Sequence, residues 1–110
     1  MAASLVGWIA FFDHTWARAQ EKCRRGLVLL EHGAGFVEIA PGVSRRPHHR
    51  YYVEVPLVDK ASGLATHTFI DLDDSGDVHE CDVEPVAQLP LPLWHAVLTK
   101  MAEYGEATDR

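Results

Sequence analysis

The sequence predicts an α+β domain in which a long N-terminal helix packs on a three- to four-stranded antiparallel sheet, followed by a C-terminal helix. Three observations predict this fold. Apolar residues recur at spacings of three and four between residues 5 and 30, the spacing changes to two after Phe36, and short turns separate the later segments. Turns of hairpin length favour an antiparallel meander over a parallel sheet.

The N-terminal segment gives the strongest periodic signal. The residues of the apolar stripe are Leu5, Trp8, Ile9, Phe12, Trp16, Ala19, Cys23, Leu27 and Leu30. On a helix they share one face, and Arg18, Lys22 and Arg25 fall on the opposite, solvent-facing side. We therefore expect a helix over at least residues 15–30, with Gly33 as a left-handed C-cap.

Both ends of this helix have a second interpretation. Phe11 and Leu29 would project onto its polar face, and Asp13 is a good N-cap residue. Residues 5–12 are therefore also compatible with a buried strand that precedes the helix. Residues 27–31 and 36–39 are likewise compatible with a hairpin closed by residues 32–35.

The remaining elements follow from alternation and from proline. Strands are predicted over residues 51–57, 66–72 and 78–83, with turns at 60–63 and 73–77. Pro56 indicates that its strand lies at an edge of the sheet or ends there. A closing helix is expected from residues 90–93 to Gly105, since proline is tolerated in a first turn. Residues 1–105 then form one domain, and 106–110 are expected to be a disordered tail.

Composition limits the class of protein. The chain has 110 residues, 47% of them hydrophobic, which suits one domain with its own core. Two cysteines are too few for a disulfide scaffold. The apolar N-terminal run ends at Asp13, too early for a membrane span and without a signal peptide's basic start. We interpret the protein as cytoplasmic, with no membrane association.

Charge is unevenly distributed. Residues 1–50 carry seven Lys/Arg and four Asp/Glu, a net charge of +3, and residues 51–110 carry three and twelve, a net charge of −9. The total is −6. Overall acidity argues against a general nucleic-acid binder, whereas the asymmetry would let the two halves attract each other.

The densest acidic stretch partly fits a calcium-binding loop. Asp71, Asp73 and Ser75 take the first, third and fifth of twelve positions, with Gly76 at the sixth. The twelfth position holds Asp82 instead of the usual glutamate, and the flanking segments are predicted strands. We therefore interpret this stretch as a metal-free acidic hairpin turn.

A second candidate metal set is His67, His79 and Cys81, because imidazole and thiolate are zinc ligands. Their spacing matches no zinc motif and a fourth ligand is not evident, so a polar sheet face explains them as well. The same residues give little support for cysteine–histidine catalysis, since nothing marks an oxyanion hole. We expect no cofactor.

One dense basic segment provides candidate binding residues. They are Arg45, Arg46, His48, His49, Arg50 and Tyr52. Arginine forks bind phosphate or carboxylate, and tyrosine rings offer stacking faces. The net charge of −6 favours a solvated loop instead, and makes nucleic acid an improbable partner.

These observations leave several hypotheses about function open. The first is a non-catalytic binding or regulatory module that forms a homodimer through the apolar N-terminal stripe and has a possible protein partner. The alternative is a small-molecule pocket protein or small enzyme with a cavity between helix and sheet. The third is an anion or nucleic-acid binder. Trp8, Trp16 and Trp94 fit a pocket, a core or a dimer seam.

Overall fold

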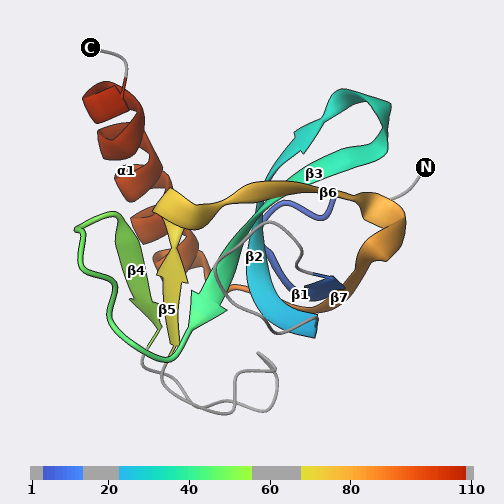
Figure 1. The fold of residues 1–110 in the computed structure, drawn as a ribbon, viewed down its shortest axis with the longest axis horizontal. Coiled ribbons are helices and arrows are strands. Elements are labelled where there is room, and N and C mark those ends of the chain that lie inside the picture. The colour runs from blue at the N-terminus through green and yellow to red at the C-terminus, as the bar shows by residue number, and fades with distance from the viewer. Residues whose placement is uncertain (1–3, 14–22, 56–67, 109–110) are drawn as a thin grey trace.

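The computed structural model describes residues 4–13, 23–55 and 68–108, and they form a curled antiparallel sheet with one helix (Figure 1). The strands are β1 (Trp8–Asp13), β2 (Cys23–His32), β3 (Phe36–Val43), β4 (Tyr52–Val55), β5 (Thr68–Asp71), β6 (Gly76–His79) and β7 (Val83–Gln88). Short 3-10 turns η1 (Gly33–Gly35), η3 (Leu72–Asp74) and η4 (Glu80–Asp82) join some of them, and the helix is α1 (Leu91–Thr108).

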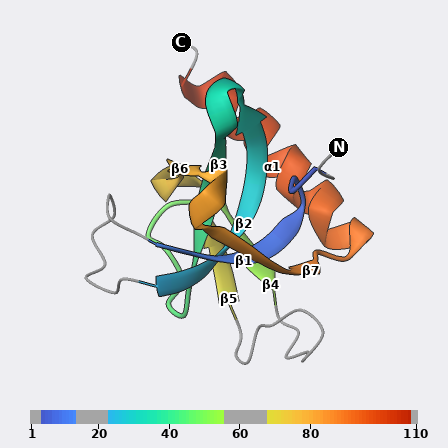
Figure 2. The same ribbon diagram turned by 90° about the vertical axis from the view of Figure 1, so that its right-hand side faces the viewer.

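The order of the strands makes β3 the centre of the sheet. The path is β4-β5-β3-β2-β1-β7, and β6 pairs with β3 beside it. The first half of β3 pairs with β6 and its last residues pair with β5, so residues 68–79 act as one broken partner strand. Figure 2 shows the sheet curling beneath α1, with β7 leading directly into the helix. The ends of the path, β4 and β7, are edge strands.

The predicted N-terminal helix is wrong where the structure describes it. Residues 8–13 and 23–32 are paired strands, with Ile9 opposite Leu27 and Phe11 opposite Arg25. The alternative interpretations are confirmed, since residues 8–12 form a strand and β2 and β3 form a hairpin closed by η1. Residues 14–22, which include Trp16, Arg18 and Lys22, lie outside the described residues.

The physical reason for this error is burial on both faces of the strands. Ile9 and Leu27 face one core, whereas Ala10, Phe12 and Val28 face the other. A strand that is apolar on both sides has no period of two. Its run of apolar residues can then match the three-and-four spacing of a helix by chance.

The helix that covers the sheet is the C-terminal one. Val97 is fully buried and belongs to the cluster that joins α1 to β1, β2, β3, β4 and β5. The predicted C-terminal helix is therefore present, and it runs past Gly105 to Thr108. The second cluster, on the other face, is centred on Phe12, Ile39 and Val37.

The predicted meander is also wrong. The strand expected over residues 78–83 is interrupted by η4, and β7 returns to pair with β1. Residues 52–55 and 68–71 are strands as predicted, and β4 is an edge strand, as Pro56 indicated. No helix in the described ranges has the length and apolarity to cross a membrane.

Candidate functional site

The basic segment forms the exposed connection between β3 and β4. Arg45, Arg46, His48 and Arg50 are all exposed at their side chains. The guanidinium of Arg46 lies 5.8 Å from the centre of the Phe69 ring and 3.7 Å from Oε1 of Glu54. Arginine stacked on an aromatic ring keeps its fork edge available to an anion. This loop therefore presents cations beside rings.

His49 holds the loop against the sheet. Its Nδ1 accepts a hydrogen bond of 3.0 Å from the backbone N–H of Tyr51, and its Nε2 lies 2.9 Å from Oδ1 of Asp71. The first bond places the ring proton on Nε2, where it is donated to the carboxylate. Both ring nitrogens are thus occupied, and His49 positions the loop without a free nitrogen for acid–base chemistry.

Two tyrosines follow the loop on opposite sides of β4. Tyr52 packs edge-on against Phe69, with ring centres 5.7 Å apart, and Tyr51 packs edge-on against Tyr104 of α1 at 5.0 Å. Arg50 donates a hydrogen bond of 3.4 Å to the Tyr51 hydroxyl. This bond raises the pKa of Arg50 above its already high ordinary value, so its guanidinium stays charged.

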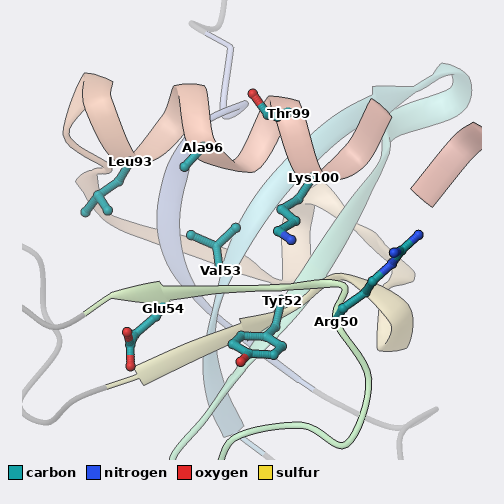
Figure 3. Close-up of a pocket in the computed structure, with 8 residues that line it drawn as sticks. All are labelled: Arg50, Tyr52, Val53, Glu54, Leu93, Ala96, Thr99 and Lys100. Carbon is teal, nitrogen blue, oxygen red and sulfur yellow. The ribbon is translucent and has the colours of Figure 1, made fainter. Parts of the chain in front are cut away.

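A groove of about 550 Å³ lies between β4 and α1 (Figure 3). Val53 points from β4 toward the helix and Lys100 points from α1 toward the strand, whereas Tyr52 and Glu54 project from the other side of β4. Arg50 lies at one end of the groove. The lining residues are Arg50, Tyr52, Val53, Glu54, Leu93, Ala96, Thr99 and Lys100. The groove is therefore apolar inside, and its polar lining combines Arg50 and Lys100 with Glu54; Lys100 also lies 3.5 Å from Oε2 of Glu103.

Arg25 of β2 is a further cation that stacks on an aromatic ring. Its guanidinium lies 4.5 Å from the centre of the Phe11 ring, and its Nε is buried without a hydrogen-bond partner among the described residues. A Cβ on Gly42 would lie 3.3 Å from the Arg25 carbonyl, so Arg25 neighbours the end of β3 where the basic loop begins. A buried donor without an acceptor is costly unless a ligand supplies one. The prediction that Arg25 is solvent-exposed is wrong, because it belongs to a strand.

The structure separates the two predicted metal sets. Asp71 accepts a hydrogen bond from the backbone N–H of Asp73 and pairs with His49, so it caps η3. His79 Nδ1 accepts from the N–H of Cys81, whose side chain is exposed, and His67 lies outside the described residues. Ser75 Oγ donates to Oε2 of Glu38 instead of facing Asp71. The bonds of Asp71 to Asp73 and of His79 to Cys81 cap short turns, whereas those of Asp71 to His49 and of Ser75 to Glu38 join distant strands.

The fold resembles known structures although the sequence does not. No family model and no curated protein sequence matches the chain. Among solved structures, toxin MazF-mt6 from Mycobacterium tuberculosis matches with a TM-score of 0.69 and 19% identity, over 93% of this chain and 96% of that one. The chain has the MazF fold.

Two crystal forms of MazE–MazF from Deinococcus radiodurans give similar matches. Form II has a TM-score of 0.68 at 17% identity and Form III has 0.66 at 16%, each over 94% of this chain and 96% of the matched chain. A match of this length at such low identity establishes a shared fold and leaves the site residues to be argued from their own geometry.

Sequence reasoning located the basic loop but missed Lys100 and Arg25. Lys100 is the only Lys or Arg between Lys60 and Arg110. A single cation in a long acidic stretch is a signal that could have identified its face of the closing helix as a candidate binding face. Arg25 was assigned to solvent because the helical period was adopted for residues 15–30. Neither residue could be linked to the loop before α1 and β2 were placed beside β4 and β3.

Proposed function

We propose that this chain is a MazF-like toxin that binds and cleaves single-stranded RNA, and that a MazE-like partner protein controls it. The observation that carries the proposal is the MazF fold, which extends over nearly the whole chain, and two arginine–aromatic contacts, Arg25 over Phe11 and Arg46 over Phe69, support it. The sequence alone favours a non-catalytic module. The fold, together with the buried unpartnered donor of Arg25, supports an enzyme instead.

Single-stranded nucleic acid suits the surface better than a duplex does. Arg46 over Phe69 and the ring of Tyr52 offer cations and stacking faces to unstacked bases. A net charge of −6 opposes close approach of a rigid duplex, whereas a flexible strand can follow one local row of cations. The expected binding surface is Arg45, Arg46, Arg50 and Tyr52.

RNA carries its own nucleophile, so cleavage requires few protein groups. The 2′-oxygen attacks the adjacent phosphorus while the bond from phosphorus to the 5′-oxygen breaks. The 2′-hydroxyl gives up a proton to a base or water, and the leaving 5′-oxygen takes one up. A cyclic 2′,3′-phosphate and a 5′-hydroxyl result. The charge that builds on the phosphoryl oxygens is met by Arg25, whose Nε has no acceptor within the described residues.

The groove between β4 and α1 suits a protein partner. β4 is an edge strand, so an extended segment can add to it through backbone hydrogen bonds. Arg50 and Lys100 at the rim favour an acidic segment, and Leu93 and Ala96 of α1 offer apolar surface to its side chains. A small-molecule pocket is the competing interpretation, but the groove lies open along a strand edge.

We also propose that the toxin is a cytoplasmic homodimer.

Cleavage of a fluorescent single-stranded RNA of mixed sequence, with DNA of the same sequence beside it, tests the proposal. We expect RNA fragments that end in a cyclic phosphate and no DNA fragments. Arg25→Ala should slow cleavage by roughly 100-fold or more, as loss of a donor to a developing oxyanion does. Arg110→Ala removes the same charge from the end of the chain and should leave the rate unchanged.

Three outcomes contradict parts of the proposal. Equal rates for wild type and Arg25→Ala would remove Arg25 from the reaction. RNA that binds but stays intact at high protein concentration would return the chain to the class of non-catalytic binding modules. An acidic peptide that binds equally well to wild type and to Lys100→Ala would place the partner away from the groove.

A further inference from the structure

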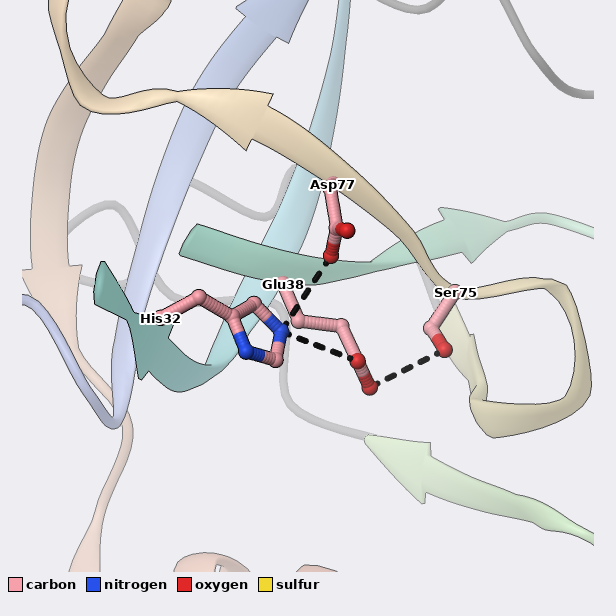
Figure 4. A network of polar contacts seen from close by, with 4 residues as sticks. All are labelled: His32, Glu38, Ser75 and Asp77. Atoms are coloured by element: carbon pink, nitrogen blue, oxygen red, sulfur yellow. Dashed lines mark hydrogen bonds and ion pairs between the residues drawn. The ribbon is translucent and has the colours of Figure 1, made fainter. Parts of the chain in front are cut away.

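A histidine and two carboxylates meet on three neighbouring strands, away from the basic loop (Figure 4). Glu38 of β3 lies directly opposite Asp77 of β6, and His32 at the end of β2 pairs with Phe36, two residues before Glu38. Residues two apart on a strand share a face, and directly paired residues do so too. The sheet register therefore brings His32, Glu38 and Asp77 together.

The cluster is poorly explained as a salt bridge alone. His32 Nε2 lies 3.3 Å from Oε1 of Glu38 and 3.2 Å from Oδ1 of Asp77. One ring nitrogen carries at most one proton, so it cannot donate a full hydrogen bond to both oxygens. Two carboxylates directly opposite each other on adjacent strands also repel. A cation between the three groups would relieve both problems.

Two of the three donor spacings fit the coordination of zinc. Zn–N and Zn–O bonds of about 2.0–2.2 Å in a tetrahedron separate the donors by roughly 3.3–3.6 Å. The two nitrogen–oxygen distances are 3.2 and 3.3 Å, and each donor atom lies within 4.8 Å of the others. Charge-assisted hydrogen bonds are usually shorter, at about 2.7–2.9 Å. The observed spacing is thus nearer to an edge of a zinc tetrahedron.

A fourth residue orients one of the carboxylates. Ser75 Oγ donates a hydrogen bond of 3.2 Å to Oε2 of Glu38, which leaves Oε1 directed at His32. Figure 4 shows this chain of contacts from Ser75 through Glu38 to His32. Ligating carboxylates in metal sites are commonly held by such a hydrogen bond. Ser75 leads into β6 just after η3, which explains why its side chain turns away from Asp71.

We propose that His32, Glu38 and Asp77 bind a divalent zinc ion, with a fourth position open to water. The imidazole favours zinc over Mg²⁺ and Ca²⁺, which prefer all-oxygen sites. The ion would link β6 to β2 and β3 at the end of β3 that does not pair with β5. The side chains of His32 and Asp77 are exposed, at 41% and 60%, so a bound ion can exchange with solvent. The proposal does not depend on RNA cleavage.

Calorimetric titration of the metal-free full chain with zinc chloride tests the site, with thermal unfolding as a second readout. We expect one zinc ion per chain and a higher Tm with zinc, and neither effect with magnesium or calcium chloride. His32→Ala should abolish both effects. Ser75→Ala should weaken zinc binding by about tenfold, since it removes only the group that orients Glu38.

Matched variants identify the ligands. Cys81→Ser removes an exposed thiol and His95→Ala removes an exposed imidazole of α1, and both should bind zinc as wild type does. Asp77→Asn covers the case in which His32→Ala fails to fold, because its side chain is the most exposed of the three. Unchanged zinc binding in Asp77→Asn, loss of binding in Cys81→Ser, or no zinc binding by wild type would each overturn the proposal.

Discussion

Gly26→Ala distinguishes the strand from the helix that the sequence predicts at the same place. In the structure, Gly26 is a buried residue of β2, opposite Ala10 on one side and Pro41 on the other. A Cβ built on it would lie 2.5 Å from the Ala40 carbonyl oxygen and 2.6 Å from Cε1 of Phe12. The first of these contacts is with backbone and cannot move aside.

The two structures predict effects of opposite sign. In a helix, glycine to alanine raises the free energy of unfolding by about 0.8–1 kcal/mol. In β2, alanine would also restrict the unfolded chain, a gain of about 0.4–1 kcal/mol, but the inserted methyl overpacks the core. Overpacking typically costs about 1–3 kcal/mol, and contact with a carbonyl oxygen places this site at the upper end. We expect a net loss of roughly 2 kcal/mol.

Urea unfolding followed by tryptophan fluorescence measures the effect, with Gly33→Ala as the control. No atom lies within 4 Å of a Cβ built on Gly33, and its φ is not in the left-handed region. Gly33→Ala should therefore lie within about 0.5 kcal/mol of wild type. A Gly26→Ala protein that is as stable as wild type, or more stable, would refute the close approach of β2 to β3.

Further predictions concern α1 and the loop. Val97→Ala should lower the free energy of unfolding by about 2 kcal/mol because Val97 is fully buried, whereas Leu98→Ala, 44% exposed, should stay within about 0.5 kcal/mol in the same urea assay. His49→Ala should cost about 1 kcal/mol by releasing Asp71 and the loop, measured by thermal unfolding against His95→Ala. Desolvation, with a hydrogen bond to Asp73, raises the pKa of Tyr104 above its ordinary value of about 10. The stability that this shift contributes is therefore fully present below pH about 10 and is lost as pH rises through the folded-state pKa of Tyr104. In an ultraviolet titration of tyrosine ionisation, Tyr104→Phe should remove a step above pH about 10.

Elements in the second half of the chain, such as β4 and α1, could be predicted from local sequence signals because tertiary contacts do not override those signals. Val53 and Val55 are buried and Glu54 is exposed, as strict alternation predicts for a half-buried strand. Prolines 90 and 92 flank the first residue of α1, as expected of a first helical turn. Each signal depends only on neighbours in the chain, so the sequence is sufficient.

The N-terminal strands could not be predicted in the same way. Whether Ala10 and Phe12 face solvent or a second core depends on β6 and β7, which come some seventy residues later. The β2–β3 register also shifts between Val28 and Leu30. Leu27 and Leu29 still share one core and Val28 faces the other, so the side chains alternate between two buried faces and leave no alternation of polar and apolar residues.

The candidate sites show the same division between local and long-range information. The basic loop is contiguous in sequence and was found. Lys100 reaches the groove only because α1 crosses β4, and His32 meets Asp77 only through two strand pairings. The candidate metal residues lie close together in sequence, and among them Asp71 and His79 cap short turns.

The distribution of charge bears on RNA binding more directly than the total charge does. Arg46 pairs with Glu54, so part of the basic loop's charge is already neutralised by the acidic half of the chain. Arg45 and Arg50 are exposed, and a strand that also displaces Glu54 from Arg46 would contact about three phosphates. For single strands, log K falls against log salt with a slope of about −0.7 per phosphate, so we expect a slope of about −2. Arg50→Ala should reduce its size by about 0.7, and Arg46→Ala by less, because Glu54 competes for that arginine at every salt concentration. A slope near zero in a filter-binding titration would mean that stacking alone binds the RNA and that the arginines hold the loop in place.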